Sequence, residues 1–420
     1  MRMTYANVDE HLGLGLDGLL RRVSPNIGRI LEKALADQEI SVDEAEQLFG
    51  ARGTDLFALL AVADVLRERA VGDVITYVIT RNINFTNVCY MGCRFCAFGR
   101  PARDPEAYTL SIDDVVQRAR EAWAWGATEV CLQGGLNPHQ PATIYEDMVR
   151  AIKAAVPDIH IHAYSPFEIW WGSRRLGISE AEFLQRLKDA GLGSIPGTAA
   201  EILVPEVRRR LTKNKLSREA WVRIIRTAHQ LGIPSTATIM YGHIDTPRHW
   251  AEHIDLLRQI QRETGGFTEF VPLGFIHERT KLYLEDGARP GPTGMEDLKM
   301  HAVARLMLQH TIPNIQVSWV KLGYKMAQMC LQAGANDFGG TLFEESISRS
   351  AGETQGTFTD PATFERFIRD LGRIPQERDT LYRPVVRGPV TLPPPRLWQP
   401  PVVQAMGEPA WVTREPIPTL

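Results

Sequence analysis

The chain has 420 residues, of which 44% are hydrophobic and 23% are charged, and its formal net charge is −3 at pH 7. This composition is ordinary for a globular protein with a buried core, and the length allows one large α/β domain with extensions. The nearly balanced charge argues against a general nucleic-acid-binding surface and against a surface for anionic membranes.

Residues 1–72 are predicted to form an N-terminal helical extension. Residues 24–38 and 41–70 carry apolar side chains at three- and four-residue spacing, which is the period of amphipathic helices. The chain does not open with a basic segment followed by an apolar run, so we read no secretory signal. The longest apolar stretch, "LFALLAVADVL", is interrupted by Asp64 and is too short to span a bilayer. We therefore expect a cytoplasmic protein without membrane contact.

Eight strand-like segments alternate with helix-like segments over residues 73–375. This alternation predicts a parallel sheet with helical crossovers, and eight repeats of this size predict an α/β fold of the (β/α)8 TIM-barrel type. The strand-like segments are 73–86, 128–135, 158–165, 191–198, 234–243, 267–275, 312–320 and 335–341. Active sites of such barrels lie at the carboxyl ends of the strands.

Residues 376–420 are predicted to be a proline-rich C-terminal tail. The segment is dense in proline and has neither helical nor strand periodicity. Because proline fixes φ and removes a backbone donor, we expect the tail to follow the surface or to be partly disordered.

Three of the five cysteines, Cys89, Cys93 and Cys96, lie within eight residues in the pattern C-x3-C-x2-C. This clustering does not resemble a disulfide framework and indicates a reducing compartment and a metal site. Three thiolates can hold three irons of a [4Fe–4S] cube and leave the fourth iron open, as catalytic metal sites require. The alternative is a structural zinc loop completed by Cys131, Cys330 or a distant histidine.

Polar motifs follow the second, third and fourth predicted strands. Gln133, Gly134 and Gly135 come first, and glycine lets a ligand approach the backbone closely, although a plain turn would use the same residues. Ser165 lies at the end of the third strand. Glu201 follows the fourth strand in what we predict to be the first turn of a helix, where it could bind a ligand or only interact with the helix dipole.

Four further residues are candidates for holding substrates. Tyr241 and His243 end the fifth strand two positions apart, so both could face the barrel axis. Glu269 lies inside the sixth strand, where a carboxylate is costly unless it is paired or binds substrate. Asn336 precedes a glycine pair in the eighth strand. We predict that all four lie at the barrel mouth, without individual roles.

The cysteine spacing, placed after the first strand of a (β/α)8 pattern, resembles that of the radical SAM superfamily. The resemblance implies one [4Fe–4S] cluster whose open iron binds S-adenosyl-L-methionine (SAM), and an external one-electron donor that triggers cleavage to a 5′-deoxyadenosyl radical. It implies that Phe95 lies against the adenine and that the glycine pair meets the methionine amino group. Ser165 and Glu201 would be further contacts to this cofactor.

Longer motifs resemble the FO synthase family, which makes a deazaflavin chromophore. They include "NINFTNVCYMGCRFCAF", "EVCLQGGLNP", "IHIHAYSP" and "GANDFGGTLFEESISRSAG", in order over roughly residues 70–360. The resemblance implies cleavage of the Cα–Cβ bond of L-tyrosine, release of 2-iminoacetate and addition of a 4-hydroxybenzyl radical to 5-amino-6-(D-ribitylamino)uracil. A companion radical SAM subunit would then close the ring.

Two other readings stay open on the sequence alone. Radical SAM enzymes of the futalosine route to menaquinone share the "CRFCAF" loop, although "HAYSP", "YGHID" and "NDFGGTLFEE" favour FO synthase. A non-catalytic metal-binding scaffold is the alternative of another class. A brown protein after anaerobic reconstitution would indicate the iron–sulfur cluster, whereas a colourless zinc protein would indicate the scaffold.

Overall fold

The computed structural model describes residues 15–212 and 215–387, so residues 388–420 of the predicted tail and the start of the predicted extension lie outside it. The strands are β1 Val74–Val78, β2 Thr80–Asn84, β3 Glu129–Gln133, β4 His160–Ala163, β5 Ser235–Tyr241, β6 Phe267–Gly274, β7 Asp337–Gly340 and β8 Ile374–Glu377. The N-terminal helices are α2 Gly15–Leu20, α3 Pro25–Leu35, α4 Val42–Phe49 and α5 Thr54–Val71. The later helices are α6 Ile112–Ala124, α7 Ile144–Ala155, α8 Pro166–Leu176, α9 Glu180–Ala190, α10 Pro205–Leu211, α11 Arg218–Gln230, α12 Pro247–Thr264, α13 Lys281–Leu284, α14 Gly294–Leu308, α15 Trp319–Leu331, α16 Ile347–Ala351 and α17 Pro361–Asp370.

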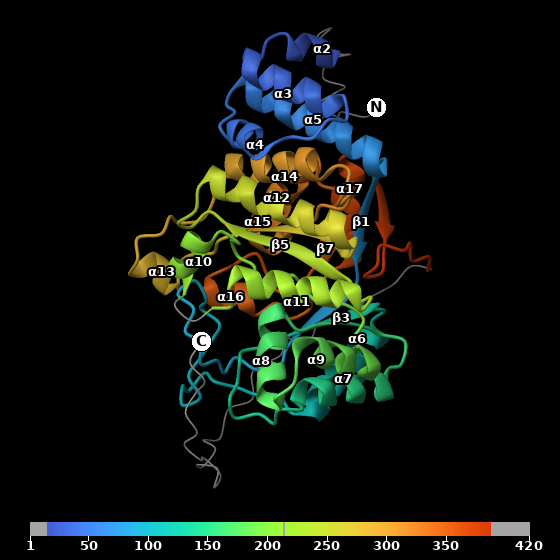
Figure 1. Cartoon of the computed structure of the whole chain (residues 1–420). Coiled ribbons are helices and arrows are strands. Elements are labelled where there is room, and N and C mark those ends of the chain that lie inside the picture. The colour runs from blue at the N-terminus through green and yellow to red at the C-terminus, as the bar shows by residue number, and fades with distance from the viewer. Residues whose placement is uncertain (1–14, 213–214, 388–420) are drawn as a thin grey trace.

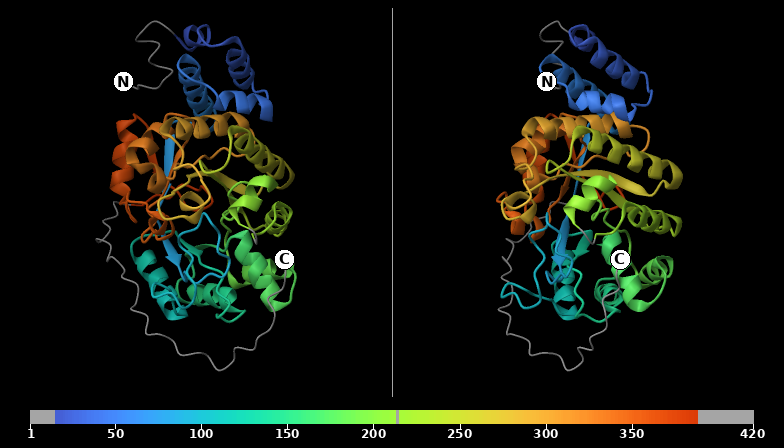
Figure 2. Two further views of the ribbon diagram at one scale, coloured as in Figure 1. Left: turned by 90° about the vertical axis from the view of Figure 1, so that its left-hand side faces the viewer. Right: turned by 60° about the vertical axis from the view of Figure 1, so that its left-hand side comes forward.

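The strands pair in parallel and close into the predicted (β/α)8 barrel. Hydrogen bonding joins β2, β3 and β4, joins β5 to β6, and joins β7 to β1. Short bridges complete the ring, namely His162–Ser194, Ile195–Ser235, Phe270–Ile315 and Gln316–Asp337. The fourth and seventh predicted strands are therefore present only as these short segments, and the first is split into β1 and β2. Figure 2 shows the barrel with its ring of helices.

The crossover helices begin where the sequence supplies caps. Ser111 accepts from the Asp114 amide while the Asp114 carboxylate accepts from the Ser111 amide, which is a capping box at the start of α6. Ser165 and Glu168 form the same arrangement at the start of α8. Because α8 follows β4 directly, its capped end lies at the carboxyl end of that strand, where barrel sites form.

The N-terminal helices form an additional layer outside the barrel. Helices α4 and α5 pack on α12 and α14, as Figure 1 shows. The Phe49 ring contacts the Trp250 ring edge-on at 5.1 Å between centroids, and the Lys299 ammonium donates to the Phe49 carbonyl. The helices α12 and α14 are thereby buried on both sides, against the sheet and against this layer.

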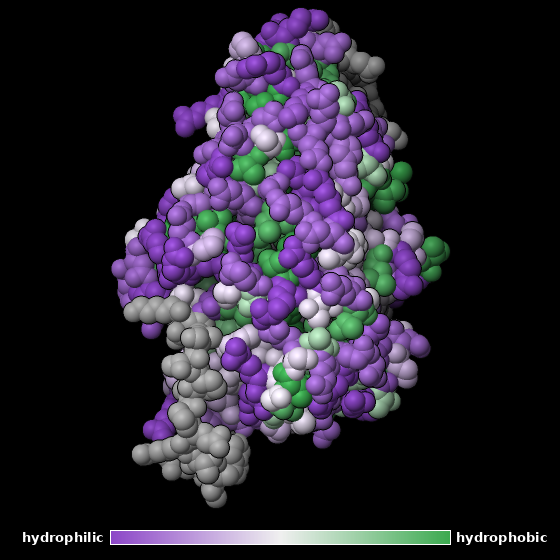
Figure 3. Space-filling model, viewed as in Figure 1, coloured by the Kyte–Doolittle hydropathy of each residue, from purple (hydrophilic) through white to green (hydrophobic). Residues whose placement is uncertain are grey.

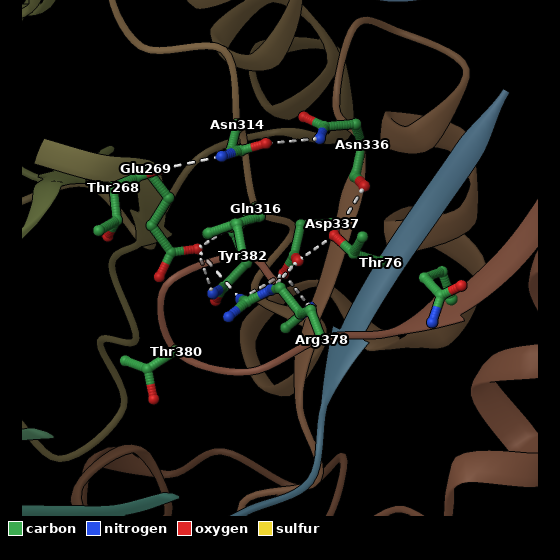
Figure 4. A network of polar contacts seen from close by, with 12 residues as sticks. Thr76, Thr268, Glu269, Asn314, Gln316, Asn336, Asp337, Arg378, Thr380 and Tyr382 are labelled. Atoms are coloured by element: carbon green, nitrogen blue, oxygen red, sulfur yellow. Dashed lines mark hydrogen bonds and ion pairs between the residues drawn. The ribbon is translucent and has the colours of Figure 1, made fainter. Parts of the chain in front are cut away.

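The segment after residue 373 differs from the predicted surface tail. Strand β8 pairs in parallel with β1, so it crosses the predicted boundary at residue 375. The following Arg378 is buried and forms an ion pair with Asp337, and its guanidinium also lies 3.4 Å from the Glu269 carboxylate (Figure 4). These residues lie near the amino ends of β6 and β7, so the segment closes the end of the barrel opposite the strand termini that form active sites.

The visible surface is mostly polar. Figure 3 shows apolar residues as small groups among hydrophilic ones on this face. Among the described helices, none combines the length and apolar character needed to cross a bilayer.

Candidate active site

A pocket opens at the carboxyl ends of the barrel strands. Its walls come from the cysteine loop after β2, the ends of β3, β5 and β6, the start of α8 and the starts of α15 and α16. All nine residues predicted to hold the cluster and SAM line it, namely Cys89, Cys93, Phe95, Cys96, Gln133, Gly134, Gly135, Ser165 and Glu201. The fold thus brings together residues from four separate strand ends.

Backbone contacts hold the cysteine loop in place at its base. The Cys89 amide donates to the Arg100 carbonyl at 2.9 Å, and the Arg100 amide donates to the Asn87 carbonyl at 2.7 Å. A Cβ added at Gly135 would lie 2.2 Å from the Val88 carbonyl oxygen, so only glycine lets the β3 loop approach this closely. The glycine pair therefore has a packing role against the cysteine loop as well as its predicted ligand role.

The three loop thiols are free and face the pocket. Burial raises the pKa of the Cys93 thiol to about 12 and also raises the pKa of Cys89. A metal must displace these protons, because thiolates are the ligands of iron. Cys131 in β3 and Cys330 in α15 do not line the pocket, which leaves three thiols there.

The described residues contain no group of three or more His, Cys, Asp or Glu arranged around a single-ion position. The zinc alternative needs Cys131, Cys330 or a histidine as its fourth ligand, and none of these is among the described residues that line the pocket. A [4Fe–4S] cube takes one thiolate on each iron, so the three thiols that line this pocket match three of its irons.

A buried carboxylate links the β3 and β4 walls of the pocket. Glu168 Oε1 accepts from the Gly134 amide at 3.0 Å, and Oε2 accepts from the Ser165 amide at 2.7 Å and its hydroxyl at 2.8 Å. Burial raises the pKa of Glu168 to about 7, although its three donors favour the charged form. Glu168 therefore positions two predicted cofactor contacts, Gly134 and Ser165.

Glu201 and Lys215 form an ion pair on the wall next to Phe95. The Lys215 ammonium donates to Glu201 Oε1 at 2.6 Å and lies 4.6 Å from the centre of the Phe95 ring. The buried Glu201 Oε2 has no hydrogen-bond partner among the described residues, and the Arg208 guanidinium is 3.8 Å away. A free acceptor at the pocket wall fits a cofactor that brings hydroxyl or amino donors.

The expectation that Glu201 opens a helix is wrong. Its φ is +38°, and helix α10 begins only at Pro205. Ala199 also has a positive φ, of +62°. Left-handed backbone at non-glycine residues costs energy and occurs often where a binding site holds it.

Two of the four predicted substrate residues, Tyr241 at the end of β5 and His243 two positions beyond it, are not among the residues that line the pocket. The Tyr241 hydroxyl donates to Asp297 at 2.6 Å, and its ring packs on Trp250, so it faces the helix layer. His243 is fully buried, where its Nδ1 accepts from the Ile244 amide and its Nε2 contacts the Met240 carbonyl. The alternation of a strand places Thr238 and Met240 in the pocket instead.

The other two, Glu269 and Asn336, lie at the opposite end of the barrel. Glu269 Oε2 accepts from Gln316 at 3.0 Å and from the Tyr382 hydroxyl at 2.6 Å (Figure 4). Asn336 Oδ1 accepts from the Ile315 amide at 2.8 Å and from Arg305 at 2.9 Å. The prediction that they line the mouth is wrong, because Glu269 lies near the amino end of β6, Asn336 directly precedes β7, and protein groups satisfy both.

Sequence reasoning missed several charged pocket residues, namely Glu168, Lys215 and Lys321. The spacing of Ser165 and Glu168 is a capping-box signal that could have drawn attention to Glu168. Lys215 and Lys321 carry no local signal, since a lysine near a helix start is ordinary on a protein surface.

A closed parallel barrel with three free thiols at the carboxyl ends of its strands defines an enzyme of the radical SAM class. The sequence matches the family model of the radical SAM superfamily over residues 83–257 and that of the CofH/MqnC C-terminal region over residues 264–388. The fold is similar to that of methylornithine synthase (PylB), with a TM-score of 0.66 at 18% identity over 82% of this chain and 97% of that one.

Curated relatives narrow the family further. The 5-amino-6-(D-ribitylamino)uracil–L-tyrosine 4-hydroxyphenyl transferase of Methanothermobacter thermautotrophicus is 52% identical over 85% of this chain and 97% of its own length. The FO synthase of Streptomyces coelicolor is 52% identical over 87% of this chain, which spans only 42% of that longer protein. The chain belongs to the family of these 4-hydroxyphenyl transferases, radical SAM enzymes that use SAM and a [4Fe–4S] cluster.

Proposed function

We propose that this chain cleaves the Cα–Cβ bond of L-tyrosine and transfers the 4-hydroxybenzyl group to 5-amino-6-(D-ribitylamino)uracil, a step of FO synthesis. The products would be 5-amino-5-(4-hydroxybenzyl)-6-(D-ribitylimino)-5,6-dihydrouracil, 2-iminoacetate, 5′-deoxyadenosine and methionine. The main support is the 52% identity to a curated transferase across 97% of that relative, together with a pocket that contains all nine predicted cluster and SAM residues.

Cys89, Cys93 and Cys96 would hold one [4Fe–4S] cluster and leave one iron for SAM. The three pocket thiols and the free acceptor of Glu201 support this assignment. When bound, the cluster and SAM would supply a 5′-deoxyadenosyl radical. Phe95 would lie against the adenine, with Ser165 and the Gln133–Gly135 segment as further SAM contacts.

The chain's own task is to bind, orient and keep water out, since the cofactor carries the difficult chemistry. Met240, Leu273 and Phe275 supply apolar wall to the part of the pocket formed by β5 and β6. Such a wall suits an aromatic substrate and helps to keep water out. Of the predicted substrate residues, Tyr241 and His243 would act only indirectly, by packing behind this wall.

The proposal also includes a companion subunit, an electron donor and a cellular compartment. A companion radical SAM subunit would consume the product, and an external one-electron donor would start each turnover. Free thiols in the pocket favour a reducing compartment such as the cytoplasm. Residues 1–72, 73–375 and 376–420 would act as extension, catalytic barrel and tail, with the part of the tail up to residue 387 completing the barrel.

An anaerobic assay tests the proposal. Reconstituted protein is incubated with dithionite, SAM, L-tyrosine and the ribitylaminouracil, and the products are read by mass spectrometry. The expected result is 5′-deoxyadenosine together with the hydroxybenzyl adduct. Turnover of a futalosine-type or chorismate-derived substrate instead would indicate the menaquinone alternative, and absence of 5′-deoxyadenosine would contradict both.

The cluster assignment has its own test. Cys93→Ala should lose bound iron and sulfide, the broad iron–sulfur absorbance and 5′-deoxyadenosine formation down to background, because one iron then lacks its thiolate. Cys330→Ala is the matched control, since Cys330 is buried in α15 away from the pocket. Equal iron content in the two variants would contradict the assignment.

A further inference from the structure

Most charged side chains that line the pocket are already neutralised or held by protein groups. Lys215 is paired with Glu201, and Glu168 is bound by the Gly134 amide and by Ser165. Lys321 differs, because within the part of the chain that the structure describes it forms no ion pair. It reaches the pocket from the first turn of α15, which follows the seventh strand position.

The Lys321 ammonium has one hydrogen-bond partner among the described residues, the Ser348 hydroxyl at 2.8 Å. Two carboxylates, Glu345 and Glu353, raise its pKa by their charge, yet burial lowers it more. Neither carboxylate lines the pocket or forms an ion pair with Lys321 among the described residues, although the buried Glu353 Oε2 has no hydrogen-bond partner there. Glu345 accepts from the Ser348 amide at 2.8 Å and from Asn82, and Glu353 accepts from the Gln355 amide.

Lys321 lies just before a kink in α15 at Gly323, and the segment that carries Ser348 is held against the barrel. The Ser346 hydroxyl donates to Asn84 in β2 at 2.6 Å, which ties the start of α16 to the barrel wall. The preceding residues 342–344 all have positive φ, between +33° and +76°, so the loop after β7 is strained into one conformation. A cation and a hydroxyl fixed 2.8 Å apart on a pocket wall form a ready site for an oxygen anion.

The proposed reaction offers one group that suits this site. The ribitylaminouracil carries amine, carbonyl and hydroxyl groups but no carboxylate. The carboxylate of SAM would be taken by the open iron, and the SAM contacts come from the loops after β2, β3 and β4. L-Tyrosine brings the remaining anion. A partly buried ammonium without an ion pair is costly, and a bound carboxylate would remove that cost.

We propose that Lys321 Nζ and Ser348 Oγ bind the carboxylate of L-tyrosine and so set which amino-acid substrate the enzyme accepts. This inference rests on the proposed function. It predicts that tyramine, which is tyrosine without its carboxylate, is a poor substrate for the wild-type enzyme because it leaves Lys321 unpaired.

The test uses the full-length, reconstituted protein with SAM bound. Lys321→Met should raise the KM for tyrosine about 10- to 100-fold, the worth of a charge-assisted hydrogen bond, and leave the KM values for SAM and the ribitylaminouracil unchanged. Lys321→Arg should recover part of the loss. The preference for tyrosine over tyramine should shrink by the same factor in Lys321→Met.

Lys325→Met is the matched control, because Lys325 lies one turn further along α15 and is exposed. Iron content and the thermal midpoint show whether each variant folds and carries its cluster. If Lys321→Met does not fold, Ser348→Ala and the wild-type comparison of tyrosine with tyramine carry the test. Equal use of tyrosine and tyramine by the wild type would overturn the inference.

Equilibrium dialysis of labelled tyrosine distinguishes a failure of the proposed function from a failure of the Lys321 inference alone. A wild-type protein that binds no tyrosine would contradict the proposed function and the inference together. A protein that binds tyrosine equally well with and without the Lys321 ammonium would overturn the inference alone. Loss of tyrosine binding in Lys321→Met, with SAM binding retained, is the result expected.

Discussion

The carboxylate of Glu168 illustrates how single side chains shape this pocket. It is buried, yet its two oxygens accept from three donors on two different strand ends. Glu168 thereby fixes the distance between Gly134 and Ser165, both predicted SAM contacts. Charged acceptors form stronger hydrogen bonds than neutral ones, so the anionic form holds these two loops most tightly.

Glu168→Gln should therefore weaken SAM binding about 5- to 30-fold, because a neutral amide accepts less strongly and brings its own donors. Glu168 is a positioning residue, so the KM for SAM should change more than kcat at saturating SAM. Glu182→Gln is the control, since Glu182 holds the same position in the first turn of α9 but is exposed. An unchanged KM for SAM would contradict this role.

At the scale of elements, one face of β5 lines the pocket and the other packs against helices. Thr238 and Met240 line the pocket, while Tyr241 packs toward α12 and α14. His253 of α12 connects the strand to the Glu201 loop. Its Nδ1 accepts from the Leu203 amide at 3.0 Å, and its Nε2 donates to the Thr238 carbonyl at 2.9 Å.

This arrangement makes the contribution of His253 to the free energy of unfolding dependent on pH. The contact from the Leu203 amide requires an unprotonated Nδ1, and burial lowers the pKa of His253 to about 3. The unfolded chain takes up the proton near pH 6.5, whereas the folded chain does not. The stabilising effect is therefore complete above pH 6.5 and is lost as the pH falls toward 3, at about 1.4 kcal/mol per pH unit.

His253→Gln should destabilise the protein by about 1–3 kcal/mol at pH 8, because a buried donor or acceptor loses its partner. The difference in unfolding free energy between the variant and the wild type should shrink at pH 5. The wild type loses stability there because of His253, whereas the variant lacks this titrating group. Urea midpoints of the reconstituted proteins at the two pH values measure this. Exposed His310→Gln is the control, and a difference for His253→Gln that is equal at pH 8 and pH 5 would contradict the linkage.

At the scale of the whole molecule, the barrel has one open end and one closed end. The pocket occupies the open end, and the segment after β8 inserts into the other (Figure 4). There Arg378 joins Asp337 to Glu269, and Tyr382 donates to Glu269 at 2.6 Å. The chain's last described residues thus complete a core that begins with β1.

Arg378→Met should destabilise the protein by about 3–5 kcal/mol, because it leaves two carboxylates buried without their cation. Arg383→Met is the control on the same segment, since the Arg383–Asp379 pair is exposed and such pairs contribute about 0–1 kcal/mol. Chemical unfolding of both variants measures the difference. Equal midpoints would show that the inserted segment does not support the barrel.

The amino-acid sequence by itself determined the barrel and the cluster of cofactor residues. Strand and helix periodicity is local, and the cysteine, glycine and serine motifs lie directly after predicted strands, so they converge wherever those strands close a barrel. The orientation of a side chain within a buried strand is not local. Tyr241 and Thr238 lie on opposite faces of β5, but both faces are buried, one by the pocket and one by α12 and α14.

Only the tertiary structure decided at which end of the barrel each polar residue lies. Glu269 and Asn336 were expected at the mouth, yet Arg378 and Arg305, distant in sequence, neutralise or satisfy them at the closed end. Lys321 became a candidate for the opposite reason, because it forms no ion pair with a carboxylate of the described residues. A buried charge needs a partner, and the sequence does not reveal whether that partner is the protein or the substrate.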